Sequence, residues 1–388
     1  MKHRSNSSPT AFVLGLARLF RQSTNASPQA IGVCLFLEYR LPLGCLVHMT
    51  PVFQAIKRSR PEVALAVATR GLGLEVLRHS PYIDHLMDVP DPTIDLRAAV
   101  FGLRKQLRAR SLRPDCVLTG ASDQRTRIGL LGMLATGGWL GGYTQAPALY
   151  ARPLAYDAGL SLIGNNLRVA TMLGCPTDVT RPRIFASAAD AQAMQELLRA
   201  VNPAGRPVAV FVTQNSRGQQ TGWHVDRFAA VIRHAERRGF AVVYVGTTAE
   251  QEAIDAVRGA ADGIGISVAG RTTVSELVAL LAMSDVMVTL DTGTMHVGRA
   301  AGVPMVILGP SWQKPIEWMP LGVNNVRILR GPDTDNVPDG YRLDEIAAES
   351  ATAAMEDLLK AHPPSMEARR ARVHESLSEI DHLAVRGL

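Results

Sequence analysis

Short apolar segments alternate along the chain with longer segments in which apolar residues recur at helical spacing. Apolar runs bounded by turn residues are typical of buried strands, and strands that alternate with helices indicate mostly parallel sheets. The expected strands are 31–37, 63–69, 85–89, 116–118, 208–213, 241–245, 266–268, 285–290, 305–309 and 326–328. The expected helices are 51–59, 72–79, 96–109, 127–135, 165–173, 188–201, 225–238, 250–261 and 273–283, with a short one in 291–304. Residues 136–157 carry Gly, Pro and Tyr with little periodicity and are expected to form a loop.

Residues 182–207 separate two such α/β halves and contain one amphipathic helix bounded by Pro, Gly and Asn. A chain of 388 residues suits two domains of ordinary size. The predicted division has a basic extension (1–29), an N-terminal Rossmann-like domain (30–185), a linker with a helix (186–205), a C-terminal Rossmann-like domain (206–350) and a helical tail (351–388).

Composition narrows the classes of function. Hydrophobic residues make up 47% of the chain and charged residues 20%, which indicates a globular protein. An aromatic content of 5% argues against a stacking platform for single-stranded nucleic acid. The formal charge is +6, yet no Lys/Arg run is dense enough for a nucleic-acid tract. We therefore expect phosphate-bearing substrates or an anionic membrane surface as partners, and no nucleic acid.

The four cysteines, Cys34, Cys45, Cys116 and Cys175, lack metal-ligand spacing. Free thiols in a reducing compartment are expected.

In the N-terminal extension, an apolar stretch (11–20, interrupted by Arg18) follows a basic start. It lacks the unbroken apolar core of a signal peptide and is too short to span a bilayer. A basic amphipathic helix on a membrane surface and a flexible extension both remain open. The expected location is cytoplasmic, with or without attachment to the inner membrane.

Residues 291–310 hold the most informative pattern in the chain. An apolar strand ends at Asp291, and a turn of small residues leads into a short helix. Such a turn directs the N–H groups of Thr292, Gly293 and Thr294 toward one spot, where the helix dipole also favours an anion. His296 follows in the first helical turn. The alternative is an ordinary βαβ crossover, but ligands bind at the carboxyl ends of strands in open α/β sheets.

This stretch resembles glycosyltransferase family 9, which includes the ADP-heptose:lipopolysaccharide heptosyltransferases. The resemblance covers roughly residues 30 to 350. It rests on Asp291–Thr292–Gly293–x–Met295–His296, Ala300–Ala301–Gly302–Val303–Pro304, Gly309–Pro310, Leu43–Gly44–x–x–Val47–His48–x–x–Pro51, Trp223 with Arg227–Phe228, and Val243–x–Val245–Gly246–x–x–x–Glu250. It implies a GT-B fold, in which two Rossmann-like domains with parallel sheets face each other across a cleft, and the tail commonly packs back on the first domain.

The resemblance also implies roles in donor binding. The turn Thr292–Gly293–Thr294 would hold the donor diphosphate, Asp291 would contact the donor sugar, and Glu250 would contact the nucleotide ribose. His296 would donate to a phosphate oxygen. Structural alternatives are a helix cap for Asp291, a packed histidine for His296 and a solvated helix-start carboxylate for Glu250.

Two positions depart from the family pattern. The family loop reads Leu-Gly-Asp, with the Asp as proposed general base, where this chain has Leu43–Gly44–Cys45. A thiol near its usual pKa of about 8.5 is a poor base for a sugar hydroxyl, so His48 and Glu38 are candidate substitutes. The family also has a phosphate-binding Lys before the Trp at position 223. It is absent here, and Arg217 or Lys314 would supply the charge.

No metal site and no cofactor are expected, because the Asp-x-Asp motif of metal-dependent glycosyltransferases is absent and the amide turn would do the metal's electrostatic work. Arg125 and Arg127 follow an expected strand of the first domain. They are candidates for contacting a phosphorylated acceptor, with ordinary solvated arginines as the alternative.

The resulting hypothesis is an inverting, metal-independent glycosyltransferase. It would move a heptose-like sugar from a nucleotide-diphosphate donor, with an ADP-sugar favoured, to a glycan or lipid-linked acceptor such as a lipopolysaccharide precursor. Two alternatives remain open: a degenerate, non-catalytic member that binds a sugar nucleotide, and a sugar-nucleotide isomerase of the 2-epimerase type.

Overall fold

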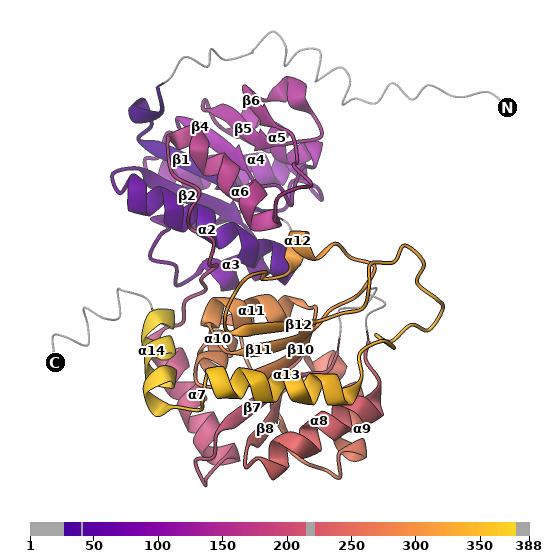
Figure 1. Cartoon of the computed structure of the whole chain (residues 1–388). Coiled ribbons are helices and arrows are strands. Elements are labelled where there is room, and N and C mark those ends of the chain that lie inside the picture. Colours follow the sequence, from indigo (N-terminus) through magenta and orange to yellow (C-terminus); the bar gives the residue numbers. More distant parts are fainter. Residues whose placement is uncertain (1–26, 40–41, 215–221, 378–388) are drawn as a thin grey trace. The chain divides into compact units, whose positions relative to one another are not determined.

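The computed structural model describes residues 27–39, 42–214 and 222–377. These residues form two compact units (Figure 1). The first comprises 27–39, 48–77 and 82–180, and the second comprises 42–47, 78–81 and 181–377.

The first unit contains a six-stranded parallel sheet in the order β3-β2-β1-β4-β5-β6. Its strands are β1 (Val33–Leu37), β2 (Ala64–Thr69), β3 (His85–Asp88), β4 (Cys116–Thr119), β5 (Trp139–Tyr143) and β6 (Arg152–Leu154). The helices in this part of the chain are α2 (Leu43–Ser59), α3 (Leu72–Leu77), α4 (Leu96–Ala109), α5 (Thr126–Ala135) and α6 (Leu162–Ala170). The four central strands are almost entirely buried because helices cover both faces of such a sheet.

The second unit repeats this order, as β12-β11-β10-β7-β8-β9, and all its strand pairs are parallel. Its strands are β7 (Val208–Val212), β8 (Ala241–Tyr244), β9 (Ile266–Ser267), β10 (Val286–Leu290), β11 (Met305–Leu308) and β12 (Val326–Leu329). Its helices are α7 (Ala188–Val201), α8 (Val225–Arg237), α9 (Gln251–Ala260), α10 (Val274–Ala282), α11 (Gly293–Ala301), α12 (Pro315–Trp318), α13 (Ala348–Ala361) and α14 (Met366–Ser376).

In both sheets the strand order reverses beside the first strand, between β1 and β4 and between β7 and β10. Ligands of open α/β sheets bind outside the carboxyl ends of the strands at such a reversal. The expectation of two Rossmann-like parallel sheets is confirmed, and each sheet offers one position of this kind.

The expected loop 136–157 was wrong, because it contains the strands β5 and β6. Two glycines in β5 hide its apolar pattern. Gly142 has a φ of +112°, and a Cβ atom there would come within 2.1 Å of the Thr119 carbonyl oxygen. Glycine is therefore required where β5 passes β4, although it weakens the sequence signal for a strand.

Helix α2 begins at Leu43, eight residues before the expected start at Pro51. Proline is common in the first turn of a helix, which made position 51 look like the start. In the structure Pro51 lies inside the helix, and the apolar side chains of Leu46 and Phe53 on either side of it are buried. Burial of this apolar face outweighs the cost of an internal proline.

Helix α14 packs against α10 and α11 of the second unit, which differs from the expected packing of the tail on the first domain. The guanidinium of Arg369 donates to the Asp285 carboxylate at 2.8 Å. After the helix, the backbone of Leu377 forms an isolated parallel β-bridge with that of Ala186. The reason is electrostatic, because Asp285 is buried and needs a cationic partner. Within the described residues, no helix has the length and apolar character needed to cross a membrane.

Candidate functional site

The turn after β10 combines a buried carboxylate with a helix N-terminus. Asp291 follows the strand and is 5% exposed, and Thr292 is the N-cap of α11. The Thr292 hydroxyl oxygen accepts the Met295 N–H at 3.3 Å. The alternative role of Asp291 as helix cap was therefore wrong, since the next residue performs it. The amides of Gly293 and Thr294, which precede Met295 in the first turn, have no acceptor within the helix.

Asp291 is held by the loop after β11. With the Gln313 amide oriented to satisfy both neighbours, its NH₂ group donates to Asp291 Oδ2 at 3.0 Å, and its oxygen accepts from Trp318 Nε1 at 2.8 Å. Arg330 fixes this loop by donating to the carbonyl oxygens of Ser311 at 3.0 Å and Gln313 at 3.1 Å. Burial raises the pKa of Asp291 to about 6, so the carboxyl group changes charge just below neutral pH.

His296 lies in α11 and is 3% exposed, with its ring centroid 6.0 Å from that of Trp318. Burial lowers its pKa to about 3, and the Arg299 guanidinium contributes to the shift. The imidazole is therefore neutral at physiological pH. It thus carries no positive charge that could offset a phosphate.

Thr213 follows β7, the strand that pairs with β10 at the reversal of the sheet. It is 3% exposed, and its hydroxyl oxygen has no hydrogen-bond partner within the described structure. A buried hydroxyl without a partner is unusual and suggests a role that the bare chain does not fulfil. We did not identify Thr213 from the sequence. Its place at the end of the strand beside β10 was the available signal.

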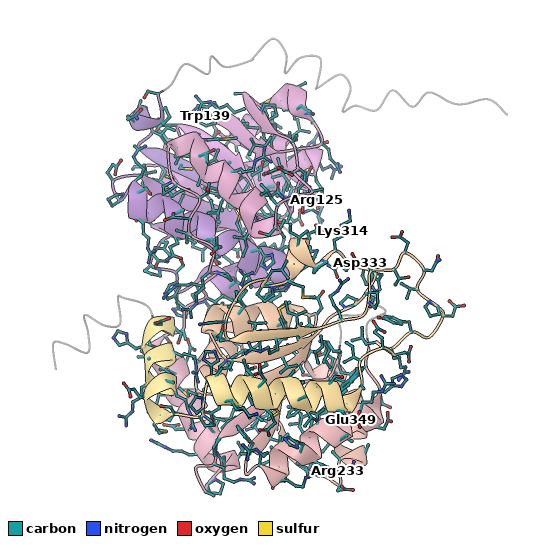
Figure 2. All side chains as sticks on the ribbon, in the orientation of Figure 1. Arg125, Trp139, Arg233, Lys314, Asp333 and Glu349 are labelled. Atoms are coloured by element: carbon teal, nitrogen blue, oxygen red, sulfur yellow. The ribbon has the colours of Figure 1, made fainter. Side chains whose placement is uncertain are left out.

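The remaining donor-site candidates are spread more widely. Glu250 accepts the Thr247 N–H at 2.6 Å in a capping box after β8, so it stands at a helix start as the alternative expected, but it has a partner there instead of being only solvated. Lys314 is exposed and projects from the start of α12 (Figure 2). Arg217 lies outside the described residues.

In the first unit the carboxyl edge of the sheet carries paired charges. Arg125 forms a bidentate pair with the buried Asp123, with Nε–Oδ1 at 2.7 Å and Nη2–Oδ2 at 2.8 Å. This pairing raises the pKa of the guanidinium. Arg125 also donates to Thr93 Oγ1 at 3.1 Å, and Arg127 donates to the Thr93 carbonyl at 2.8 Å. Both arginines contact Thr93. Arg125 is held by its pair with Asp123, whereas Arg127 is exposed, as expected for the alternative of a solvated arginine.

The three candidate bases are all buried. Glu38 follows β1 and is 0% exposed, whereas Cys45 and His48 lie on α2 at 5% and 1%. Cys45 is in the first turn of that helix, and the His48 carbonyl accepts from Asn166 Nδ2 at 3.1 Å. Beside Glu38, burial and the carboxylates of Asp91, Asp88 and Asp123 raise the pKa of Tyr39, which keeps its hydroxyl protonated. Among the described residues, no group of three or more His, Cys, Asp or Glu side chains is arranged to hold a metal ion.

Comparisons with known proteins identify the family and the fold. The family model described as glycosyltransferase family 9 (heptosyltransferase) matches residues 129–342. Lipopolysaccharide heptosyltransferase 3 of Escherichia coli K12 is 25% identical over 349 residues, which covers 83% of this chain and 97% of that protein.

Solved structures show the same fold. A family 9 glycosyltransferase from Veillonella parvula matches with a TM-score of 0.74 at 19% identity, covering 85% of this chain and 97% of that one. Escherichia coli heptosyltransferase WaaC, solved with ADP-2-deoxy-2-fluoro heptose, matches with a TM-score of 0.62 at 16% identity, covering 84% and 99%. The expected GT-B fold is confirmed by these matches.

Proposed function

We propose, from the premise that the chain belongs to glycosyltransferase family 9, that it transfers a heptose-like sugar from a nucleotide-diphosphate donor. The proposed acceptor is a lipopolysaccharide or other cell-surface glycan precursor at the cytoplasmic face of the inner membrane. The relative from Escherichia coli is a lipopolysaccharide heptosyltransferase, and WaaC was solved with an ADP-sugar analogue. The first supports a heptose and a lipopolysaccharide acceptor, and the second supports an ADP-sugar as the donor.

One observation carries the proposal: the turn between β10 and α11 places a buried carboxylate, Asp291, directly before a helix N-terminus. The N–H groups of Gly293 and Thr294 and the dipole of α11 would receive the diphosphate. The unpartnered hydroxyl of Thr213 at the neighbouring strand end would donate to the same anion. Asp291 would accept from a hydroxyl of the sugar, and Glu250 would contact the ribose with the carboxylate oxygen that Thr247 does not use.

Transfer would proceed by one displacement. The acceptor oxygen bonds to the anomeric carbon while the bond from that carbon to the diphosphate oxygen breaks, so the configuration inverts. The leaving diphosphate would be stabilised by the amides and the neutral His296, with Lys314 or Arg217 as the cation, and without a divalent metal. This arrangement replaces the family Lys that the chain lacks.

The proton of the acceptor hydroxyl needs a base. Glu38 is the strongest candidate, because a carboxyl group is ordinarily ionised at neutral pH and can accept a proton, whereas the thiol of Cys45 is ordinarily still protonated. Glu38 also lies near the guanidinium of Arg125. His48 is the second candidate. Arg125 and Arg127 would position the acceptor through the part of their guanidinium groups that Asp123 and Thr93 leave open.

The test is to offer the full chain a panel of ADP-, UDP- and GDP-sugars with a deacylated lipopolysaccharide core acceptor and to measure the nucleoside diphosphate released. Release from ADP-heptose that continues in chelator supports the proposal. Release only with UDP- or GDP-sugars contradicts the donor assignment, and activity that is lost in chelator and restored by magnesium contradicts metal independence.

A second candidate function is donor binding without transfer, which is favoured by Cys45 at the position of the family Asp. Calorimetry with ADP distinguishes the two. Tight ADP binding without release from any donor identifies a binding protein. The isomerase hypothesis is not retained, because the family assignment covers more than half of the chain.

A further inference from the structure

The exposed face of α4 differs from the rest of the surface in its charge. Residues 96–114 contain six basic side chains and no Asp or Glu, which equals the formal excess of the whole chain, +6. These side chains are Arg97, Arg104, Lys105, Arg108, Arg110 and Arg113, and all six are exposed. This helix and the turn that follows it therefore carry a local excess of positive charge between the carboxylates of Asp95 and Asp115.

None of these six side chains forms an ion pair within the described part of the chain, whereas arginines elsewhere on the surface do. Arg233 pairs with Asp262 at 2.6 Å and Arg327 pairs with Asp357 at 2.6 Å. Unpaired like charges on one face repel each other, and an external anion would relieve this repulsion.

Large apolar side chains project from the same face. Phe101 is 70% exposed and Ile94, just before the helix, is 79% exposed. Arg97, Phe101, Arg104 and Arg108 follow at helical spacing, so they form one stripe. Arg104 also donates to the Leu134 carbonyl at 2.6 Å, and Leu134 is itself 40% exposed. We refer to Ile94, Arg97, Phe101, Arg104, Lys105 and Arg108 as the α4 patch.

A polar cavity of about 1070 Å³ adjoins the carboxyl end of α4, between this helix and the end of α5. Arg104, Arg108 and Arg113 contribute to its lining, together with the hydroxyl-bearing Ser111 and Thr136. Arg104 and Arg108 thus belong both to the α4 patch and to the lining of this cavity, which also includes the carboxylate of Asp115.

We propose that the α4 patch docks the protein on an anionic phospholipid bilayer. Phe101 and Ile94 would enter the boundary between headgroups and acyl chains, and the arginines and Lys105 would contact the lipid phosphates with their aliphatic stems against the apolar layer. A nucleic acid would satisfy the charges but would leave the two apolar side chains in water. This inference goes beyond the proposed sugar transfer and does not depend on it, although docking would bring the enzyme to a lipid-linked acceptor.

The experiment measures cosedimentation of the full chain with vesicles of phosphatidylglycerol and phosphatidylcholine, and with phosphatidylcholine alone. We compare the wild type with R104Q/K105Q/R108Q and with Phe101→Ser. The control R237Q/K360Q/R370Q removes the same charge from exposed positions of the second unit. Because each basic residue near an anionic surface contributes substantially to binding, the triple patch variant should bind at least about tenfold more weakly.

Phe101→Ser leaves the charge of the protein unchanged and should weaken binding to the anionic vesicles by roughly tenfold. The variant lacks the aromatic side chain that the wild type would transfer from water into the bilayer. The control should change binding by less than about twofold, and 0.5 M salt should weaken it for the wild type. Equal losses in the patch and control variants would overturn the proposal. So would binding that Phe101→Ser leaves unchanged, or equal binding to neutral vesicles. A patch that binds duplex DNA as tightly as vesicles would identify a nucleic-acid surface instead. Thermal unfolding of each variant checks that it folds, and transfer to a deacylated acceptor should be unaffected.

Discussion

The two sheets have the same strand order, yet their carboxyl edges differ in chemistry. At the reversal in the second unit, the turn after β10 presents backbone amides, the hydroxyl of Thr213 and a neutral His296. At the reversal in the first unit, the charges of Asp123 and Arg125 already neutralise each other, and Glu38 is buried beside them. The arrangement in the second unit suits an anion that brings its own charge. The arrangement in the first unit suits the uncharged hydroxyls of a sugar. Topology fixes where a ligand binds, and the few residues after each strand decide which ligand.

The largest expected effect tests whether proton transfer is separate from anion binding. Replacing Cys45 by Asp restores the family's base, and a general base typically contributes about 10²–10⁴-fold. We expect Cys45→Asp to raise the transfer rate by up to this factor while leaving the Kd for ADP unchanged. The rate is measured as nucleoside diphosphate release, and the affinity by calorimetry.

Cys45→Asn is the matched control, since it has nearly the same shape as Asp without its basicity and should not raise the rate. Glu38→Gln and His48→Ala should identify the native base by abolishing wild-type transfer. If Cys45→Asp changes nothing and both of the other variants remain active, the base lies elsewhere and the non-catalytic function becomes the better one.

The next effect concerns the response of the second-unit turn to acid. The folded-state pKa of His296 lies near 3, below its ordinary 6.5, so its contribution to stability is present above pH 6.5 and is lost as the pH falls toward 3. Asp291 acts in the opposite direction. Its folded-state pKa of about 6 exceeds the ordinary 3.8, so acidification from pH 6 to 4 favours the folded state.

These two contributions oppose each other in the wild type between pH 7 and 4, and the loss from His296 exceeds the gain from Asp291 by about 1 kcal/mol. On going from pH 7 to 4, the unfolding free energy of His296→Gln should therefore rise by about 3 kcal/mol relative to the wild type, and that of Asp291→Asn should fall by about 2 kcal/mol. Urea unfolding at the two pH values measures both. Parallel curves for all three proteins would show that the turn is more solvated than its burial indicates.

A smaller effect separates donor from acceptor recognition. Asp291→Asn would remove the charge-assisted hydrogen bond that we propose to the donor sugar, so kcat/KM for the donor should fall by roughly 10–100-fold at pH 7.5. In the wild type, kcat/KM should also fall below pH 6 as Asp291 becomes protonated, and this acid limb should be absent in the variant. If only the KM of the acceptor changed, Asp291 would not act in donor recognition, and the assignment of the donor to the second sheet would be contradicted.

The smallest effect has opposite signs for folding and for binding. Thr213→Val keeps the shape and removes a buried hydroxyl that has no partner, so the unfolding free energy should rise by about 1 kcal/mol. Donor affinity should fall by a few-fold if the hydroxyl donates to the diphosphate. Thr289→Val is the control, because that buried hydroxyl donates to the Leu290 carbonyl and its loss should destabilise the fold. Unchanged ADP affinity in Thr213→Val would remove Thr213 from the site.

Strands such as β7 and β10 were predictable because their mostly apolar sequences indicate a buried strand whichever elements pack against them. The strand β5 was not, since the glycines that let it approach β4 also erase its pattern. Helix α2 was misplaced because the sequence does not show that burial compensates for an internal proline.

The candidate site, like the fold, was predictable only where local sequence determines the structure. The turn at Asp291–Thr294 could be identified from local sequence, whereas the partners of Asp291 and Arg125 come from other segments. Gln313 lies after β11, and Thr93 lies after β3. Such contacts depend on which strands become neighbours. Local patterns therefore identified candidate residues but did not show which of their charges are already used.

The stability of the second unit depends on the C-terminal helix α14, because the buried carboxylate of Asp285 takes its cationic partner from that helix. Asp285 accepts from Arg369 at 2.8 Å through one oxygen and from the Val208 N–H at 2.7 Å through the other, at the start of β7. A premature stop codon before position 369 would leave this carboxylate buried without its cation, against the first strand of the second sheet. Such a truncated chain would be a substrate for cellular proteases rather than a shorter enzyme.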